Sequence, residues 1–311
     1  MALPNWHPDA EEIARRRVEG QTGYDLQLRQ TFQEDINVVS MTRRDVLLDL
    51  DLSPSDCLYR LRREENDAAR VIYVHVVDID LLPEESQTSA FELIRDLSRF
   101  RGWDDSWDTL TISKSGDTDV QCVPNAFKLH AIPQSIACGS YPLFDILDLE
   151  VITSKKPRVA YVKNGTEQCY LKYARFAFEI QWTTQELGAY HALAQKKSRL
   201  APQLLGYVFE GPNRRIIGFL LEALVGRPAN ITDEKLCEEA LQSLHDLGIT
   251  HGDPNKENIL ITDSGPRFID LEDSVMQPLD NPQAWEAMKN EDLCKMKMHL
   301  RRSSDAGCSW S

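Results

Sequence analysis

The feature that most constrains this chain is the run HGDPNKEN at residues 251–258, which is followed by Asp270 after an apolar stretch. Asp253 and Asn258 lie five residues apart, and Asp270 follows twelve residues later. Residues 259–270 read as a hairpin, which would bring Asn258 and Asp270 together at its two ends. Two oxygen ligands in that arrangement can reach a metal-bound phosphate. Asp253 then remains free to orient an attacking hydroxyl.

The size of the chain predicts two domains. It has 311 residues, of which 42% are apolar, and one domain usually takes roughly 100–200 residues. The formal net charge of -14 argues against binding to nucleic acid, because phosphate backbones attract a basic surface. We therefore expect two globular domains and no nucleic-acid partner.

Cysteine usage and hydropathy indicate a compartment. The seven cysteines include no CxxC pair, which argues against a disulfide framework or a zinc site and favours a reducing environment. The first residues lack the apolar core of a signal peptide, and no apolar run is long enough to span a membrane. We expect a protein of the cytoplasm or nucleus that is neither secreted nor membrane-bound.

The first part of the chain, residues 1–143, predicts an α+β domain. The pattern favours a helix at residues 8–17, a buried strand at 71–79 and a helix whose capping box begins at Ser89. Residues 114–117 predict the turn of a hairpin. A stretch containing prolines and a glycine ends near residue 143 and marks the expected boundary. No motif in this domain indicates its role.

The second part of the chain shows a different order of elements. Three strands, a helix and two further strands are followed by a helix, the 251–258 loop with its hairpin, and a last helix. Thr232 is the expected cap of the helix before the loop, and Gly248 its terminator. The predicted strands are 151–154, 158–163, 168–173, 204–209 and 215–221, and the predicted helices are 183–194, 232–247 and 284–300.

This order, together with the loop, resembles the catalytic domain of the protein kinase superfamily from about residue 143 to residue 300. The HGD form resembles its atypical branches, including aminoglycoside and choline phosphotransferases and the kinases of the KEOPS and RIO groups. The resemblance implies a bilobal kinase-like fold preceded by the additional α+β domain. It predicts an N-terminal lobe at 144–221, a hinge at 222–226 and a reduced C-terminal lobe at 227–311.

The resemblance assigns Lys172 and Glu186 to phosphate positioning. Lys172 lies in the middle of an apolar strand, and a buried ammonium needs a partner. In the family this lysine touches the α- and β-phosphates of ATP and pairs with a helix glutamate, here Glu186. Two alternatives stay open: Lys172 as a surface lysine with a buried stem, and Glu186 in a capping box with Thr183.

The resemblance also assigns roles to residues of the loop and of the segment after the hairpin. Asp253 would orient the acceptor hydroxyl, and Asn258 and Asp270 would bind Mg²⁺. Each of these residues alone is also common in turns. Asp292, in the last helix, resembles the buried aspartate that supports the catalytic loop, and its alternative is a solvated helix residue.

Two further segments are implied to bind ATP. Glu222 and Leu224 lie where the family has the linker whose backbone pairs with adenine. Ser154, Lys155 and Lys156 occupy the phosphate-covering turn, which here contains no glycine. Its backbone therefore cannot approach phosphates as closely as a glycine-rich turn does.

The glycine-free turn and a short C-terminal lobe leave a second interpretation open. The metal-binding tripeptide ends in Glu272 instead of glycine, and only 39 residues follow it (311 minus 272). That length is too short for the activation segment and full helical lobe of regulated protein kinases.

Taken together, the loop, the lysine and the order of elements predict an ATP- and Mg²⁺-dependent phosphotransferase acting on a protein or small-molecule hydroxyl. The alternative is a pseudokinase that serves as a nucleotide- or protein-binding module.

Overall fold

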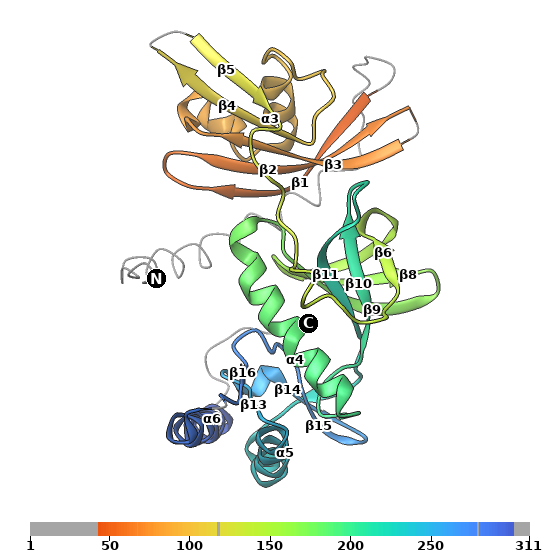
Figure 1. Ribbon diagram of the computed structural model, residues 1–311, viewed down its shortest axis with the longest axis vertical. Helices are drawn as coiled ribbons and strands as arrows, with labels where there is room; N and C mark the ends of the chain where they lie inside the picture. Colours follow the sequence, from red (N-terminus) through yellow and green to blue (C-terminus); the bar gives the residue numbers. More distant parts are fainter. Residues whose placement is uncertain (1–42, 67, 117–118, 279, 302–311) are drawn as a thin grey trace. The chain divides into compact units, whose positions relative to one another are not determined.

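A computed structural model describes residues 43–66, 68–116, 119–278 and 280–301 (Figure 1). The chain divides into two compact units, Met1–Lys128 and Leu129–Ser311. Both contain sheets and helices, so the predicted α+β class is confirmed. The helix predicted at residues 8–17 lies outside the described residues. Within the described residues, no helix is both long enough and apolar enough to cross a membrane.

The first unit is built on a five-stranded sheet in the order β1-β2-β3-β4-β5. All neighbouring pairs are antiparallel except β3 and β4, which are parallel. A parallel connection needs a crossover, and helix α3 provides it. The elements are β1 (Arg43–Leu52), β2 (Cys57–Glu65), β3 (Ala68–Val76), α3 (Ala90–Leu97), β4 (Thr109–Ser115) and β5 (Asp119–Pro124).

The predicted helix after Ser89 is present, but its predicted capping box is not. The Ser89 side chain makes no hydrogen bond to the backbone of the first turn. It donates instead to the carboxylate of Glu92. The hydroxyl and the carboxylate thus pair with each other and not with the helix backbone. Burial of Leu93 and Leu97 against the sheet stabilises α3.

The core of the first unit encloses a charged side chain. Arg63 is fully buried, and its guanidinium lies 4.8 Å from the ring centroid of Trp103 and 4.6 Å from that of Trp107. Its Nε and Nη2 donate to the two carboxylate oxygens of Asp45 at 2.7 and 3.0 Å. A buried charge of this kind is tolerated because it is paired and hydrogen-bonded.

The second unit begins with a six-stranded sheet in the order β6-β10-β11-β9-β8-β7. The five predicted strands of this region are confirmed, and β6, which pairs in parallel with β10, was not predicted. In Figure 1 the long helix α4 runs beside this sheet. The elements are β6 (Leu143–Asp145), β7 (Glu150–Lys156), β8 (Val159–Asn164), β9 (Glu167–Tyr173), α4 (Ile180–Gln195), β10 (Leu204–Glu210) and β11 (Arg215–Glu222).

Two helices and two small sheets complete the second unit. The strands form the orders β12-β14-β15 and β13-β16, and β14 and β15 are the predicted hairpin. Helix α5 ends before Gly248, whose φ of 75° is the left-handed conformation expected of a helix-terminating glycine. The elements are β12 (Arg227–Pro228), α5 (Glu234–Asp246), β13 (Ile249–Thr250), β14 (Ile259–Thr262), β15 (Gly265–Phe268), β16 (Val275–Met276) and α6 (Pro282–Arg301).

The cap before α5 is Asn230, and the expectation of Thr232 is wrong. Asn230 Oδ1 accepts from the backbone N–H of Thr232 at 2.9 Å, and Asp233 Oδ2 accepts from the N–H of Asn230 at 2.9 Å. The reason is a short 3₁₀ turn at Ile231–Asp233 that precedes α5 and moves the cap two residues earlier.

The boundary between the units falls after Lys128, fifteen residues before the predicted boundary at residue 143. Residues 129–142 are hydrogen-bonded to the second unit. The N–H of Ile132 donates to Ile216 O at 2.7 Å, and the N–H of Tyr207 donates to Pro142 O at 2.9 Å. The prolines and glycine of this stretch therefore shape a segment along β10 and β11, not a free linker.

We predict that Asp45→Ala destabilises the protein by about 3–5 kcal/mol, because it leaves the buried Arg63 guanidinium without its carboxylate. Asp104→Ala is the matched control, since Asp104 is 89% exposed and pairs with Arg43 at the surface. Urea denaturation followed by tryptophan fluorescence measures both. Equal stability of the two variants would contradict this account of the core.

Candidate active site

Lys172 lies at the centre of the candidate site. It is in β9, which pairs with β8 on one side and with β11 on the other. Its side chain is 11% exposed, and Nζ lies 2.6 Å from Glu186 Oε1 and 2.6 Å from Asp270 Oδ1. The structure thus brings together three predicted residues from a strand, from α4 and from the segment after β15.

Burial and charge act against each other at this cluster. Burial disfavours the ammonium of Lys172, but the carboxylates of Glu186 and Asp270 outweigh it and raise the pKa of Lys172. Burial also opposes ionisation of Asp270, yet Lys172 and Lys156 lower the pKa of this carboxyl. Burial raises the pKa of Glu186 to about 7, because Lys172 compensates it only in part. Lys172 and Asp270 are therefore charged at neutral pH.

Asp270 lies two residues after the β14–β15 hairpin and has a strained backbone conformation. Its φ of 64° is left-handed, a conformation that aspartate adopts more readily than most residues. The next N–H, from Leu271, donates to Glu186 Oε1 at 3.1 Å. Glu186 therefore holds both the lysine and the backbone beyond Asp270. The capping box considered for Glu186 with Thr183 is wrong, because α4 begins at Ile180, so that Thr183 lies inside the helix and donates its hydroxyl to Glu179 O.

The loop at residues 251–258 holds Asp253 in one orientation. Asp253 Oδ2 accepts from Asn255 Nδ2 at 2.7 Å and from Asn258 Nδ2 at 3.2 Å. In the described part of the chain, Oδ1 of Asp253 and Oδ1 of Asn258 accept no hydrogen bond. The N–H of Ile269 donates to Asn258 O at 2.9 Å, which ties the loop to the strand end before Asp270.

Asp292 supports this loop from α6. It is 2% exposed, and its Oδ2 and Oδ1 accept from the backbone N–H groups of His251 and Gly252 at 2.7 and 2.9 Å. His245 Nε2 lies 3.0 Å from Oδ2. Asp292 is thus the buried support that the sequence suggested, and the alternative of a solvated helix residue is wrong.

His251 and Gly252 have structural reasons for their identities. Burial lowers the pKa of His251, and its Nε2 lies 3.1 Å from Ile269 O, so the neutral ring supports the hairpin. Gly252 has a φ of 85°, and a Cβ there would lie 2.2 Å from Asp273 O. Only glycine fits at this turn before Asp253.

Of the three residues expected to cover phosphates, Ser154, Lys155 and Lys156, it is Lys156 that reaches the cluster. Lys156 Nζ lies 3.1 Å from Asp270 Oδ2. Lys155 is exposed and makes no ion pair with any described residue, and Ser154 is half-buried in β7. Arg158, in the turn between β7 and β8, places Nη2 at 2.6 Å from Glu272 Oε2. Strand alternation separates Lys155 from Lys156, but only the tertiary structure decides which one faces Asp270.

The predicted linker follows β11 directly. Glu222 Oε2 accepts from the N–H of Gln203 at 3.1 Å, and the N–H of Glu222 donates to Gln203 O at 2.9 Å. The Glu222 side chain is therefore engaged by the chain itself. Leu224 is half-buried, and Val225 beside it is 91% exposed. The structure places these residues at the end of the sheet that carries Lys172.

A group of three carboxylates could bind a cation. One oxygen from each of Glu186, Asp270 and Glu272 lies within 4.8 Å of the others. Carboxylate and amide oxygens are the ligands that Mg²⁺ prefers, so the donor set fits this ion chemically. Glu272 was noted in the sequence only as a departure from glycine, and its position in this group was not predicted.

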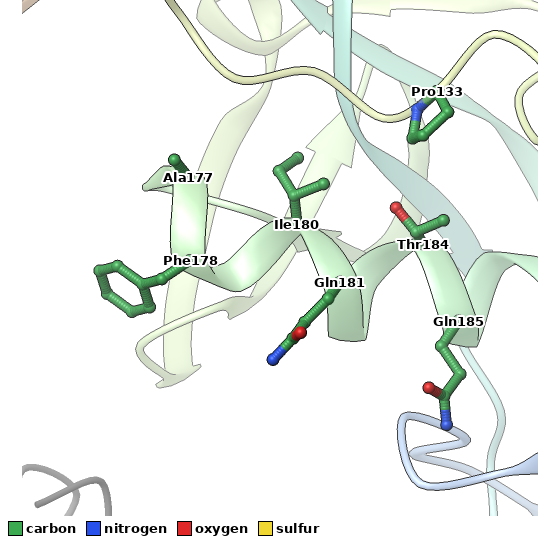
Figure 2. A pocket seen from close by; sticks show the side chains of 7 residues that line it. All are labelled: Pro133, Ala177, Phe178, Ile180, Gln181, Thr184 and Gln185. Atoms are coloured by element: carbon green, nitrogen blue, oxygen red, sulfur yellow. The ribbon is translucent and has the colours of Figure 1, made fainter. Parts of the chain in front are cut away.

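The cavity in Figure 2 lies away from this cluster. It is a shallow, open hollow of about 600 Å³ at the surface of α4. At 100° per helical residue, its lining positions on α4 face away from Glu186. No predicted site residue lines it. The lining residues are Pro133, Ala177, Phe178, Ile180, Gln181, Thr184 and Gln185.

Neither a protein-family model nor a curated protein sequence matches the chain. The assignment of a function therefore depends on the arrangement of the residues described above.

We predict that the Glu186 carboxyl destabilises the native state as pH rises. Its native pKa of about 7 exceeds the ordinary value of 4.5, so its stabilising contribution is complete below pH 4.5 and is lost as pH rises through about 7. The free energy of unfolding of the wild type, relative to Glu186→Gln, should fall across this window. Urea titrations at a series of pH values measure it, and a constant difference would contradict the prediction.

We also predict that Asp292→Ala destabilises the protein by about 2 kcal/mol or more, because two backbone donors lose their acceptor in a buried loop. Glu291→Ala is the control on the same helix. Its side chain is 63% exposed and pairs among the described residues with Lys295 alone, so its loss should cost about 0.5 kcal/mol or less. Urea denaturation of both variants tests the role of Asp292, which a similar loss in both would refute.

Proposed function

We propose that the unit Leu129–Ser311 is a bilobal protein kinase-like domain that transfers the γ-phosphoryl group of ATP to a hydroxyl. The observation that carries this proposal is the pairing of Lys172 with both Glu186 and Asp270, beside a loop that holds Asp253 and Asn258. The sheet with α4 would form the N-terminal lobe. Residues 222–226 would form the hinge, and α5 and α6 would form a reduced C-terminal lobe.

Lys172 would bind the phosphates. Its raised pKa keeps the ammonium charged, and its two carboxylate partners fix its position. A phosphate oxygen that approaches Nζ meets a preorganised positive charge in a largely buried setting. Glu186 is then a positioning residue, because it acts through Lys172.

Asn258 and Asp270 would hold Mg²⁺. Asn258 Oδ1 has no hydrogen-bond donor in the described residues, and Asp270 offers a carboxylate that stays ionised. Glu272 contributes a further oxygen nearby. When bound, the ion would neutralise charge on the phosphate oxygens.

Asp253 would orient the acceptor. Its Oδ2 is held by Asn255 and Asn258, and its Oδ1 is free to accept a hydrogen bond from a hydroxyl. The hydroxyl oxygen forms a bond to the γ-phosphorus, the bond from that phosphorus to the bridging oxygen of ADP breaks, and the hydroxyl proton passes to Asp253. Positioning and electrostatics would supply the rate enhancement, with no covalent enzyme intermediate.

The acceptor class is a hydroxyl on a protein or on a small molecule. Asp253, Asp270, Glu272 and Asp273 lie close enough that, after burial, the other three carboxylates raise the pKa of Asp273. An acceptor with a positive charge would be attracted to this acidic surrounding.

A pseudokinase is the second candidate, and the occupied carboxylate of Asp270 favours it. Both of its carboxylate oxygens are held by lysines, one by Lys172 and the other by Lys156. Residues 153–157 also lack glycine. Thermal stabilisation by ATP with and without Mg²⁺ separates the two candidates, because only the enzyme needs metal-dependent binding.

We predict that Asp253→Asn lowers phosphoryl transfer by about 10²-fold or more and leaves ATP affinity within about twofold, because Asp253 contacts the acceptor and not the nucleotide. Asp263→Asn is the matched control in the exposed β14–β15 turn. Transfer from γ-labelled ATP to a panel of proteins and metabolites measures the rate, and calorimetry measures the affinity. Equal transfer by wild type and Asp253→Asn would end the proposed role.

A further inference from the structure

Two ion pairs join the turn between β7 and β8 to the segment after β15. Lys156 Nζ lies 3.1 Å from Asp270 Oδ2, and Arg158 Nη2 lies 2.6 Å from Glu272 Oε2. Lys156 ends β7 and Arg158 lies two residues later in the turn, and the two carboxylates are two residues apart in the opposite segment. The pairs therefore run side by side and hold the turn against the carboxylates. These two ion pairs are here called the 156–158 clamp.

The two lysines at Asp270 are not equivalent. Lys172 is 11% exposed and shares Asp270 with a second carboxylate, Glu186. Lys156 is 55% exposed, and Asp270 is its one ion-pair partner among the described residues. Exposed ion pairs contribute little to stability, because water and salt screen them. Lys156 is therefore the ligand of Asp270 that another cation can replace.

We propose that Lys156 competes with a divalent cation for Asp270 Oδ2, so that cation binding opens the 156–158 clamp and releases Lys156 toward the phosphates of the nucleotide. This inference rests on the proposed function. In this proposal, the side chain of Lys156 contacts the phosphates, a contact that the backbone of a glycine-rich turn would otherwise make. In the cation-free protein, the two ion pairs hold the β7–β8 turn next to Asp270 and Glu272.

Arg158 connects this change to an optical signal. Its guanidinium lies 5.4 Å from the ring centroid of Trp182 on α4, and its partner Glu272 is two residues from Asp270. When the clamp opens, Arg158 leaves both Glu272 and the indole. The emission of Trp182 therefore reports the position of the turn.

The direct test is Mn²⁺ binding, measured by electron paramagnetic resonance of the free ion. Lys156→Met should tighten Mn²⁺ binding by about threefold or more, because the competing ammonium is gone. Lys163→Met removes one positive charge from β8, where Lys163 pairs with Glu150, and should bind like the wild type. Asp270→Asn should lose the binding.

The outcomes separate this inference from the proposed function. If the wild type and Lys156→Met bind Mn²⁺ equally and Asp270→Asn does not bind, the competition is refuted while the metal site of the proposed function stands. If neither the wild type nor Lys156→Met binds Mn²⁺, both proposals fail. Binding that survives in Asp270→Asn also overturns the inference, since the ion then lies elsewhere.

The opening of the clamp has its own readout. Mg²⁺ should change the tryptophan emission of the wild type and leave that of Trp182→Phe unchanged, although five other tryptophans remain in the chain. Lys156→Met should show the change at a lower Mg²⁺ concentration than the wild type. Emission that does not respond to Mg²⁺ in the wild type would overturn the release of the turn.

Discussion

The charge of Lys172 is the constraint on which the candidate site depends. An ammonium in the middle of a sheet is costly unless carboxylates accompany it. Helix α4 brings Glu186, and the segment after the β14–β15 hairpin brings Asp270, each at 2.6 Å from the ammonium of Lys172. The same contacts that pair the lysine therefore gather one ammonium and two carboxyl groups from three distant parts of the chain.

A second network fixes the loop that faces this cluster. Asp292 binds two successive backbone N–H groups, and Asn258 binds the side chain and carbonyl of Asp253. The neutral ring of His251 contacts the strand end before Asp270. These contacts hold polar groups in place without a ligand, as the proposed catalysis by positioning would require.

Local patterns in the sequence predicted the strands β7 to β11 of the second unit, the β14–β15 hairpin and the end of α5. Strand alternation, hairpin turns and the helix-ending Gly248 act over few residues, so they can be recognised without tertiary contacts. They also indicated that Lys172 needs a partner. The cap at Asn230, the strand β6 and the packing of residues 129–142 were missed, since each depends on contacts formed only in the folded unit. The ion pairs of Lys156 with Asp270 and of Arg158 with Glu272 belong to this second group, because the partners lie 114 residues apart in the chain.

The most direct test of the central claim is the affinity for ATP in the presence of Mg²⁺, measured by isothermal titration calorimetry. The account predicts that the wild type binds, that Lys172→Met weakens binding by about tenfold or more, and that Lys235→Met, an exposed lysine change on α5, leaves it unchanged. A wild type that does not bind ATP, or a Lys172→Met variant that binds as tightly as the wild type, would contradict it.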